Sequence, residues 1–176
     1  MSQQPITPGA SPFHLVVMGV SGVGKTTVAK QLAVRLDYEF AEGDDFHPPA
    51  NVAKMSAGTP LEDSDRLPWL RSLADWVGER HREGTSTVLT CSALRRRYRD
   101  VLREGADNTV FVHLVGDRAL LLERMSGRQH FMPPALLTSQ FDALEPLQAD
   151  EAGVSVEVTE PPEELVEEVV SRLGLA

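Results

Sequence analysis

The chain has 176 residues, of which 41% are hydrophobic, so it is long enough for one domain with a sizeable core. Its formal net charge of −9 argues against nucleic acid as the main partner, because phosphate backbones attract basic surfaces. No stretch approaches the ~20 apolar residues of a membrane span, so we expect no membrane association. Cys91 is the single cysteine, which excludes an internal disulfide and favours a reducing compartment, the cytoplasm.

The first predicted elements follow a proline-containing start. Residues 1–12 hold three prolines and few apolar side chains, which predicts a disordered tail before one folded domain over residues 13–176. Phe13–Met18 is a short apolar run typical of a buried parallel strand. After a glycine-rich stretch, Val28, Leu32 and Leu36 recur at helical spacing, which predicts a helix over Lys25–Leu36.

The stretch between this strand and this helix has the pattern G-x-x-x-x-G-K-T. Glycines permit backbone conformations closed to residues with a Cβ, so several N–H groups can point at one anion. The lysine of this pattern reaches the β- and γ-phosphates, and its threonine hydroxyl can bind Mg²⁺. A coincidental turn is the alternative. We predict that ATP binds to this phosphate loop, which consists of Gly19, Val20, Ser21, Gly22, Val23, Gly24, Lys25, Thr26 and Thr27.

Strand and helix patterns alternate along the rest of the chain. Further strands are predicted over Tyr38–Glu42, Thr87–Cys91, Thr109–Val115 and Val154–Val158. Further helices are predicted over about Asp65–Arg82, Ala93–Glu104, Arg118–Ser126, Pro134–Leu144 and Pro162–Leu173. This alternation predicts an α/β fold with a five-stranded parallel sheet and helices on both faces. The carboxyl ends of the strands then share one edge, where ligands bind.

Two segments, Asp44–Asp63 and Gly127–Pro134, interrupt the alternation. Insertions at the ligand edge of a sheet often form substrate loops and lids. We therefore expect an acceptor-binding insertion over about residues 44–82 and a lid over about residues 124–134.

Acidic side chains and a histidine follow the second predicted strand, at Glu42, Asp44, Asp45 and His47. The strand period of two places Glu42 and Asp44 on the same side, toward the phosphate loop. A carboxylate there can orient Mg²⁺ or accept a proton from an attacking hydroxyl, although a solvated acidic turn is the alternative. We assign Glu42 with Thr26 to the metal, Asp44 to the catalytic base, and His47 to the substrate.

The helix after the first insertion begins near the ligand edge. Asp65 is predicted to cap it, with Pro68 in its first turn. Trp69 and Trp76 are expected in the core rather than as stacking platforms for a ligand. Arg66 lies at the start of this helix and can contact an anionic substrate.

Basic residues cluster after the third predicted strand. Ser92 is a good N-cap for the following helix, and Arg95 and Arg99 stand four residues apart on one face. We interpret Arg95 as an anion contact, and Arg96 and Arg97 as a solvated face.

Arg124, Arg128 and His130 occupy the predicted lid. Arginines in a mobile segment suit closing over a transferring phosphoryl group, because they neutralise its charge. An ordinary helix surface is the alternative.

Four stretches together resemble the gluconokinases, small P-loop carbohydrate kinases related to shikimate and adenylate kinases. They are GVSGVGKTT, EGDDFHPPANVAKMSAGTPLEDSDRLPWL, CSALRRRYRDVLR and HFMPPALLTSQFDALEP. The first is shared by a vast superfamily, whereas GD-x-x-H, KM-x-x-G-x-PL-x-D-x-DR-x-PWL and CSAL are specific. The resemblance implies transfer of the ATP γ-phosphoryl group to the 6-hydroxyl of D-gluconate, often by a homodimer.

Gluconate is a polyol carboxylate, so its pocket needs cations at one end and a base at the other. With the resemblance, we assign the catalytic roles to Lys25, Asp44 and Arg128, and Arg124 to the nucleotide. Substrate contacts are assigned to Asp44, His47, Lys54, Arg66, Arg95, Arg99 and His130.

Three other functions were considered. A shikimate-type or nucleoside monophosphate kinase is the alternative enzyme. A GTP-hydrolysing switch calls for an N-K-x-D signature, which the sequence lacks. A non-catalytic nucleotide-binding module is disfavoured because Lys25, Thr26 and Asp44 are all present.

Overall fold

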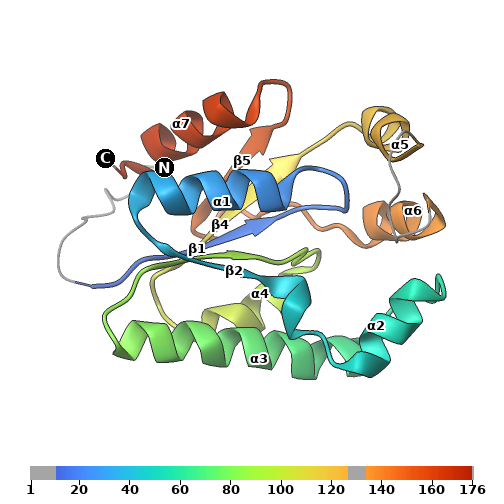
Figure 1. Cartoon of the computed structure of the whole chain (residues 1–176), viewed down its shortest axis with the longest axis horizontal. Coiled ribbons are helices and arrows are strands. Elements are labelled where there is room, and N and C mark those ends of the chain that lie inside the picture. The colour runs from blue at the N-terminus through green and yellow to red at the C-terminus, as the bar shows by residue number, and fades with distance from the viewer. Residues whose placement is uncertain (1–10, 127–133, 176) are drawn as a thin grey trace.

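The computed structural model describes residues 11–126 and 134–175. These residues form a parallel five-stranded sheet between two layers of helices, as the sequence predicts (Figure 1). The strand order is β2–β3–β1–β4–β5, with the first strand in the centre. The predicted tail lies almost entirely outside the described residues, as does most of the predicted lid.

The strands are β1 (His14–Met18), β2 (Glu39–Glu42), β3 (Thr87–Thr90), β4 (Thr109–Val115) and β5 (Gly153–Glu157). The helices are α1 (Lys25–Leu36), α2 (Pro49–Ser56), α3 (Asp63–Arg82), α4 (Arg96–Arg103), α5 (Arg118–Ser126), α6 (Pro134–Ala143) and α7 (Pro162–Leu173). A 3₁₀ turn, η1, spans Gly43–Phe46. No helix in the described ranges combines the length and apolar character needed to cross a bilayer.

The central strand explains how the two layers are held together. Alternate side chains of β1 enter different apolar clusters, because successive residues of a strand point to opposite faces. Leu15 and Val17 join the cluster that includes α1 and α7, and Val16 and Met18 join the cluster that includes α3 and α4. Figure 1 shows these helix pairs on opposite faces of the sheet. The three central strands β1, β3 and β4 are therefore buried on both faces, as their mostly apolar sequences require.

Helix α2 and the turn η1 were not predicted. The Pro48–Pro49 pair suggests a break, but Pro49 occupies the first position of α2, where a missing N–H costs no hydrogen bond. Asp44 consequently lies in a 3₁₀ turn rather than in an extended strand. The period-two argument that paired it with Glu42 is therefore wrong.

Helix α3 starts at Asp63, two residues earlier than predicted, with Glu62 at its N-cap. Asp65 lies at the third helical position, where its carboxylate accepts a hydrogen bond from the Glu62 N–H at 2.9 Å. The assignment of Asp65 as the N-cap is wrong, and Pro68 lies inside the helix rather than in its first turn.

Asp65 also joins α2 to α3. The Asp65 carboxylate accepts a hydrogen bond from Lys54 at 2.7 Å, and its backbone carbonyl accepts one from Asn51 at 3.0 Å. Asn51 is buried, and its amide group also lies 3.2 Å from Nδ1 of His47, so its polar atoms have partners inside the protein. Helix α2 is thus attached to α3 through Asp65, and both helices belong to the predicted insertion.

Helix α4 starts at Arg96 instead of Ala93. The intervening residues form an irregular connection in which Ala93 has a φ of 45°. Just before it, the Ser92 carbonyl accepts a hydrogen bond from the Gly19 N–H at 3.3 Å. Ser92 is therefore not the N-cap, because the helix begins four residues later. The Ser92 backbone instead contacts the phosphate loop. Arg95 occupies the cap position instead.

Candidate active site

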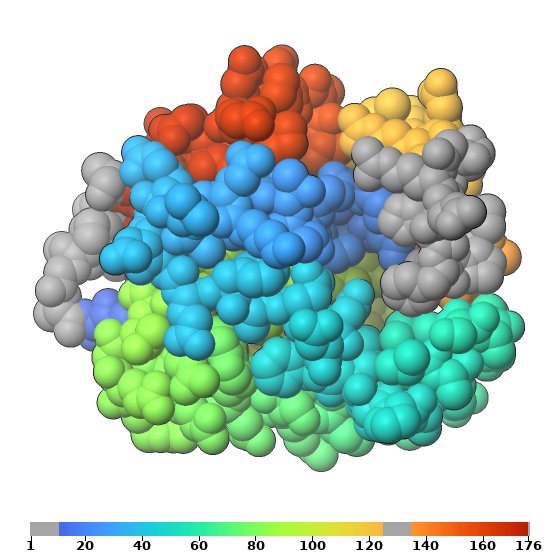
Figure 2. Space-filling model, viewed as in Figure 1, coloured from blue at the N-terminus to red at the C-terminus, as the bar shows by residue number. Residues whose placement is uncertain are grey.

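A pocket lies at the carboxyl ends of the strands, where several segments distant in sequence meet. In Figure 1, the loop between β1 and α1 faces α2, α5 and α6 at one end of the molecule. Figure 2 shows α2 and α5 at that same end in the space-filling view. The described residues that line the pocket are Ser21, Lys25, Asp44, His47, Met55, Thr59, Pro60, Leu61, Arg66, Trp69, Ser92, Leu94, Tyr98, Leu136, Ser139 and Gln140.

The phosphate loop has backbone conformations that glycine favours. Gly19 has a φ of 146° and Gly24 a φ of 104°. A Cβ on Gly19 would lie 2.8 Å from the carbonyl oxygen of Leu114 on β4, so no larger residue fits without displacing the loop. The loop ends at the N-terminus of α1, whose unpaired N–H groups favour an anion.

The Lys25 ammonium lies over its own loop, donating hydrogen bonds to the carbonyls of Gly19 at 3.0 Å and Val20 at 3.1 Å. Loss of hydration lowers the pKa of Lys25, and the negative charge of Asp44 opposes this shift. The two residues line the same pocket. The structure therefore brings a cation and a carboxylate to one pocket at the phosphate loop.

Thr26 and Glu42 meet beside the loop. The Thr26 hydroxyl donates to Glu42 Oε2 at 2.7 Å, and the Thr90 hydroxyl donates to Glu42 Oε1 at 2.5 Å. Thr90 Oγ1 also accepts a hydrogen bond from the Gly43 N–H at 3.0 Å, which fixes the end of β2 against β3. A hydroxyl and a carboxylate are oxygen ligands of the kind that Mg²⁺ prefers.

Asp44 lies in the mouth of the pocket with its side chain 62% exposed. Partial desolvation raises the pKa of Asp44 above its ordinary value, while Lys25 opposes the rise and Asp45 adds to it. Asp45 is exposed and lies outside the described pocket lining. The two neighbouring carboxylates therefore differ in position, which makes one a control for the other.

His47 stacks on Trp69, with ring centroids 3.9 Å apart and an interplanar angle of 18°. Its side chain is only 2% exposed, and burial, with the positive charge of Arg66, lowers its pKa to about 4. Trp69 donates its indole N–H to the Gly43 carbonyl at 2.8 Å. His47 is therefore neutral at neutral pH, and its contact with Asp44 at 3.7 Å is not an ion pair there.

Arg66, in the first part of α3, lines the pocket. Its guanidinium donates to the Tyr98 hydroxyl at 3.2 Å and lies 5.4 Å from the centre of that ring. The Tyr98 hydroxyl in turn donates to Asp63 at 2.6 Å. These contacts hold the guanidinium against the pocket wall. Lys54 and Arg95 lie outside the described lining, the first in its hydrogen bond to Asp65 and the second at the cap of α4.

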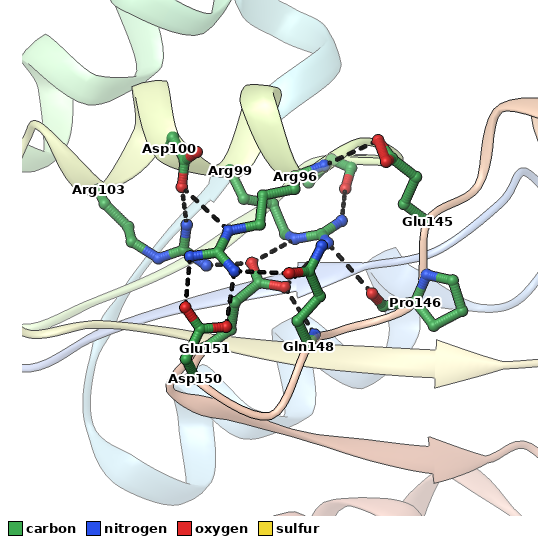
Figure 3. A network of polar contacts seen from close by, with 10 residues as sticks. Arg96, Arg99, Asp100, Arg103, Glu145, Pro146, Gln148, Asp150 and Glu151 are labelled. Atoms are coloured by element: carbon green, nitrogen blue, oxygen red, sulfur yellow. Dashed lines mark hydrogen bonds and ion pairs between the residues drawn. The ribbon is translucent and has the colours of Figure 1, made fainter.

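Arg99 has a different role from the one predicted. Its side chain is fully buried and forms an ion pair with Glu151 at 2.7 Å. Its remaining N–H groups donate to the carbonyls of Ala93 at 2.9 Å and Pro146 at 3.3 Å. Figure 3 shows this network between α4 and the segment before β5. The assignment of Arg99 to the substrate is wrong, because its guanidinium is occupied inside the protein.

The Arg99–Glu151 pair leads to a prediction about stability. Burial alone raises the pKa of Glu151, but hydrogen bonds from Arg99, the Gln148 N–H and Arg103 outweigh burial and lower the pKa to about 2. Glu151→Gln leaves a buried guanidinium without its counter-charge, which typically costs about 3–5 kcal/mol. We expect a loss of this size in urea denaturation at pH 7. The Glu151 charge stabilises the wild type above pH ~4.5, and that contribution is lost as the pH falls toward ~2.

Asp150→Asn is the matched control. Asp150 pairs with Arg96 on the surface and its side chain is 69% exposed, so its loss is expected to cost less than about 1 kcal/mol. Equal losses in the two variants would show that burial does not distinguish these ion pairs.

Comparison with known proteins places the chain in a family. Residues 15–147 match the model of the AAA domain family. The chain is 47% identical to the gluconokinase of Gluconobacter oxydans (strain 621H) over 171 residues. The aligned region covers 97% of this chain and 96% of that protein. It is also 42% identical to the thermoresistant gluconokinase of Escherichia coli (strain K12), over 86% of this chain and 87% of that protein. The chain belongs to the gluconokinase family.

Solved structures agree with this placement in the gluconokinase family. A gluconokinase from Sinorhizobium meliloti 1021 has a TM-score of 0.83 at 45% identity, with 94% of each chain covered. A sugar kinase from Janibacter sp. HTCC2649 has a TM-score of 0.90 at 52% identity, covering 94% of this chain and 96% of that one. A shikimate kinase from Aquifex aeolicus vf5, at 16% identity and a TM-score of 0.59, shares the fold alone.

Several lining residues of this gluconokinase-family pocket were not predicted. Helix α6 contributes Leu136, Ser139 and Gln140, and the segment after α2 contributes Thr59, Pro60 and Leu61. They lie in the stretches LLTSQFDALEP and GTPLEDSDR, which carry the family resemblance. Their side-chain chemistry did not single them out in the sequence, because all six are uncharged and three of them are apolar.

The predicted lid residues are only partly placed. Arg124 is exposed on α5. Arg128 and His130 lie outside the described residues, so their assigned roles stay predictions.

Proposed function

We propose that this protein transfers the γ-phosphoryl group of ATP to the 6-hydroxyl of D-gluconate, producing ADP and 6-phospho-D-gluconate. The observation that carries the proposal is a near-full-length similarity to gluconokinases. The pocket agrees with it, because Lys25 at the phosphate loop, Asp44 and Arg66 line one cavity.

The phosphate loop binds the nucleotide in this proposal. Its backbone N–H groups and the N-terminus of α1 hold the phosphates, and Lys25 exchanges its carbonyl contacts for the β- and γ-phosphates. Lys25 thereby stabilises the charge that develops as the bond between the γ-phosphorus and the bridging oxygen breaks. Arg124 and Arg128 neutralise further charge on the transferring group.

The acceptor binds between α2, α3 and α4. Arg66 receives the gluconate carboxylate and His47 contacts the hydroxyls, since both residues line the pocket. The roles of Lys54, Arg95 and His130 at the substrate stay predictions from the sequence. The oxygen of the 6-hydroxyl bonds to the γ-phosphorus while Asp44 accepts the hydroxyl proton. The bond between the γ-phosphorus and the bridging oxygen breaks, and its electron pair leaves with ADP. The neutral imidazole of His47 suits a hydroxyl partner, because it can donate or accept a hydrogen bond.

A magnesium ion fits beside the loop. Thr26 and Glu42 offer oxygen ligands 2.7 Å from each other, next to the predicted phosphate position. Mg²⁺ in kinases commonly uses few protein ligands and completes its shell with phosphates and water. When bound, it neutralises charge on the phosphates.

A coupled assay of ADP release tests the substrate. Gluconate, shikimate, glycerate and nucleoside monophosphates are offered at equal concentration with ATP. Gluconate is expected to give the highest kcat/KM. Faster turnover of shikimate or of a nucleotide would contradict the proposal.

Arg66 provides a prediction about the acceptor. Arg66→Ala removes a charge-assisted hydrogen bond to the carboxylate, so the KM for gluconate should rise by roughly 10- to 150-fold, with little change in the KM for ATP. Arg71→Ala, on the exposed side of the same helix, is the control and should leave both values unchanged. If only the KM for ATP rises, Arg66 belongs to the nucleotide side.

We also propose that the protein is a cytoplasmic homodimer. A dimer agrees with the family resemblance, and a reducing compartment agrees with the single cysteine, Cys91, which is buried and free. Sedimentation at micromolar concentration should give twice the chain mass, and the mass of one chain would contradict the dimer.

A further inference from the structure

Gln140 links α6 to the phosphate loop through two hydrogen bonds. Its Oε1 accepts a hydrogen bond from the Ser21 N–H at 2.7 Å, and its Nε2 donates one to Ser21 Oγ at 3.2 Å. The orientation of the carboxamide follows from chemistry, because a backbone N–H can only donate and must therefore face the carbonyl oxygen. One side chain, 119 residues later in the sequence, thus contacts both the N–H and the hydroxyl of one loop residue.

Helix α6 is itself anchored to the other side of the pocket. Just after the helix, the Glu145 N–H donates to the Leu94 carbonyl at 2.6 Å. Leu94 lies two residues after Ser92. The Ser92 carbonyl accepts a hydrogen bond from the Gly19 N–H at 3.3 Å. The phosphate loop, α6 and the connection before α4 therefore form a closed ring of contacts, and Gln140 joins the loop to α6 in that ring.

The position of Ser21 in the pocket is the basis for assigning this link to one phosphate. Ser21 and Lys25 line the pocket together with Asp44 and Arg66. In the proposed function the acceptor enters this pocket, so the phosphate at this part of the loop is the one that is transferred. Gln140 lines the same pocket.

We propose that Gln140 is a positioning residue for phosphoryl transfer, holding the Ser21 end of the loop in the shape that receives the γ-phosphate. The inference rests on the proposed kinase function and adds to it a residue outside the loop motif. Gln140 acts through Ser21, so its loss affects the transferred phosphate more than the rest of the nucleotide. A loop that is held in one shape stabilises a transition state because its phosphate-binding N–H groups need no reorganisation during the reaction.

Two variants test the proposal. Gln140→Ala removes both hydrogen bonds, and kcat is expected to fall by at least about tenfold, with little change in the KM for gluconate. Gln140→Glu keeps an acceptor for the Ser21 N–H but adds a negative charge near the γ-phosphate. Isothermal titration should then show a larger loss of affinity for ATP than for ADP, because ATP has the additional phosphate charge.

Thr138→Glu is the matched control, since it adds the same charge at an exposed position of the same helix. It should change neither affinity. Equal losses of ATP and ADP affinity in Gln140→Glu, or wild-type kcat in Gln140→Ala, would overturn the proposal. Tighter ATP binding in Gln140→Ala would also overturn it, because the carboxamide would then compete with phosphate for the Ser21 N–H.

The nucleotide titrations do not depend on the acceptor. A wild type that binds ATP but does not phosphorylate gluconate would refute the proposed function and leave the Gln140 comparison intact. A wild type that phosphorylates gluconate, with variants that behave as the control does, would refute only the role of Gln140. Melting temperatures of all variants identify any change caused by unfolding.

Discussion

Lys25→Ala is expected to abolish phosphoryl transfer while the protein stays folded. The ammonium contacts only backbone carbonyls of its own loop among the described residues, so the core does not depend on it. Its contact with the phosphates strengthens as charge develops, and such contacts contribute about 10²–10³ in kcat or more. The coupled ADP-release assay measures the loss, and the melting temperature reports on the fold.

Lys30→Ala is the control for Lys25→Ala. Lys30 is an exposed lysine on the same helix, one and a half turns farther from the loop, and its ammonium lies over the ring of Phe40. Activity close to wild type is expected for it. Wild-type turnover by a folded Lys25→Ala variant would remove the basis for placing ATP at this loop.

Asp44→Asn is expected to lower kcat by ~10²–10⁴, the usual contribution of a positioned base. The amide keeps the shape of the side chain but cannot accept the proton. Asp45→Asn is its control, because Asp45 lies outside the described pocket lining. If Asp45→Asn is the inactive variant and Asp44→Asn is active, the catalytic base is Asp45 and not Asp44. If both variants remain active, catalysis depends on positioning and charge neutralisation without a base at η1.

The pH dependence gives the Asp44 prediction a second readout. Only the ionised carboxylate acts as a base, so the wild-type rate should fall as the pH decreases through the raised pKa of Asp44. Asp44→Asn should lack this acidic limb. Because the pKa is raised, ionising Asp44 costs more in the folded chain than in the unfolded chain. Removing the charge should therefore leave the melting temperature at pH 7 unchanged or slightly higher.

The sheet and most helices could be predicted because their sequence patterns are local. The strands at the centre of the sheet, such as β1, are short and mostly apolar, and helix α1 shows its buried face as Val28 and Leu32. The phosphate loop was also predictable, since its function requires a fixed spacing of glycines before a lysine. These features depend on neighbouring residues and not on contacts formed by folding.

The errors arise where a distant segment decides the outcome. The spacing of Arg95 and Arg99 suggests that they share one helix face. Arg99 is buried instead, because its guanidinium pairs with Glu151, which lies 52 residues after it in the sequence. Pro48–Pro49 suggests a loop, whereas Asn51 and Lys54 find partners on α3 that stabilise a helix there. Gln140 was missed because its partner, Ser21, lies 119 residues earlier in the chain.

The shared attachment of α2 and α3 at Asp65 has a consequence for local unfolding. Asn51 and Lys54 both contact Asp65, and the same carboxylate accepts the N–H at the start of α3. Fraying of the first turn of α3 therefore releases α2, and detachment of α2 weakens that turn. The two segments should exchange their amide hydrogens as one cooperative unit, separately from the central sheet. The acceptor side of the pocket would then be ordered or disordered as a whole, while the nucleotide side keeps its shape.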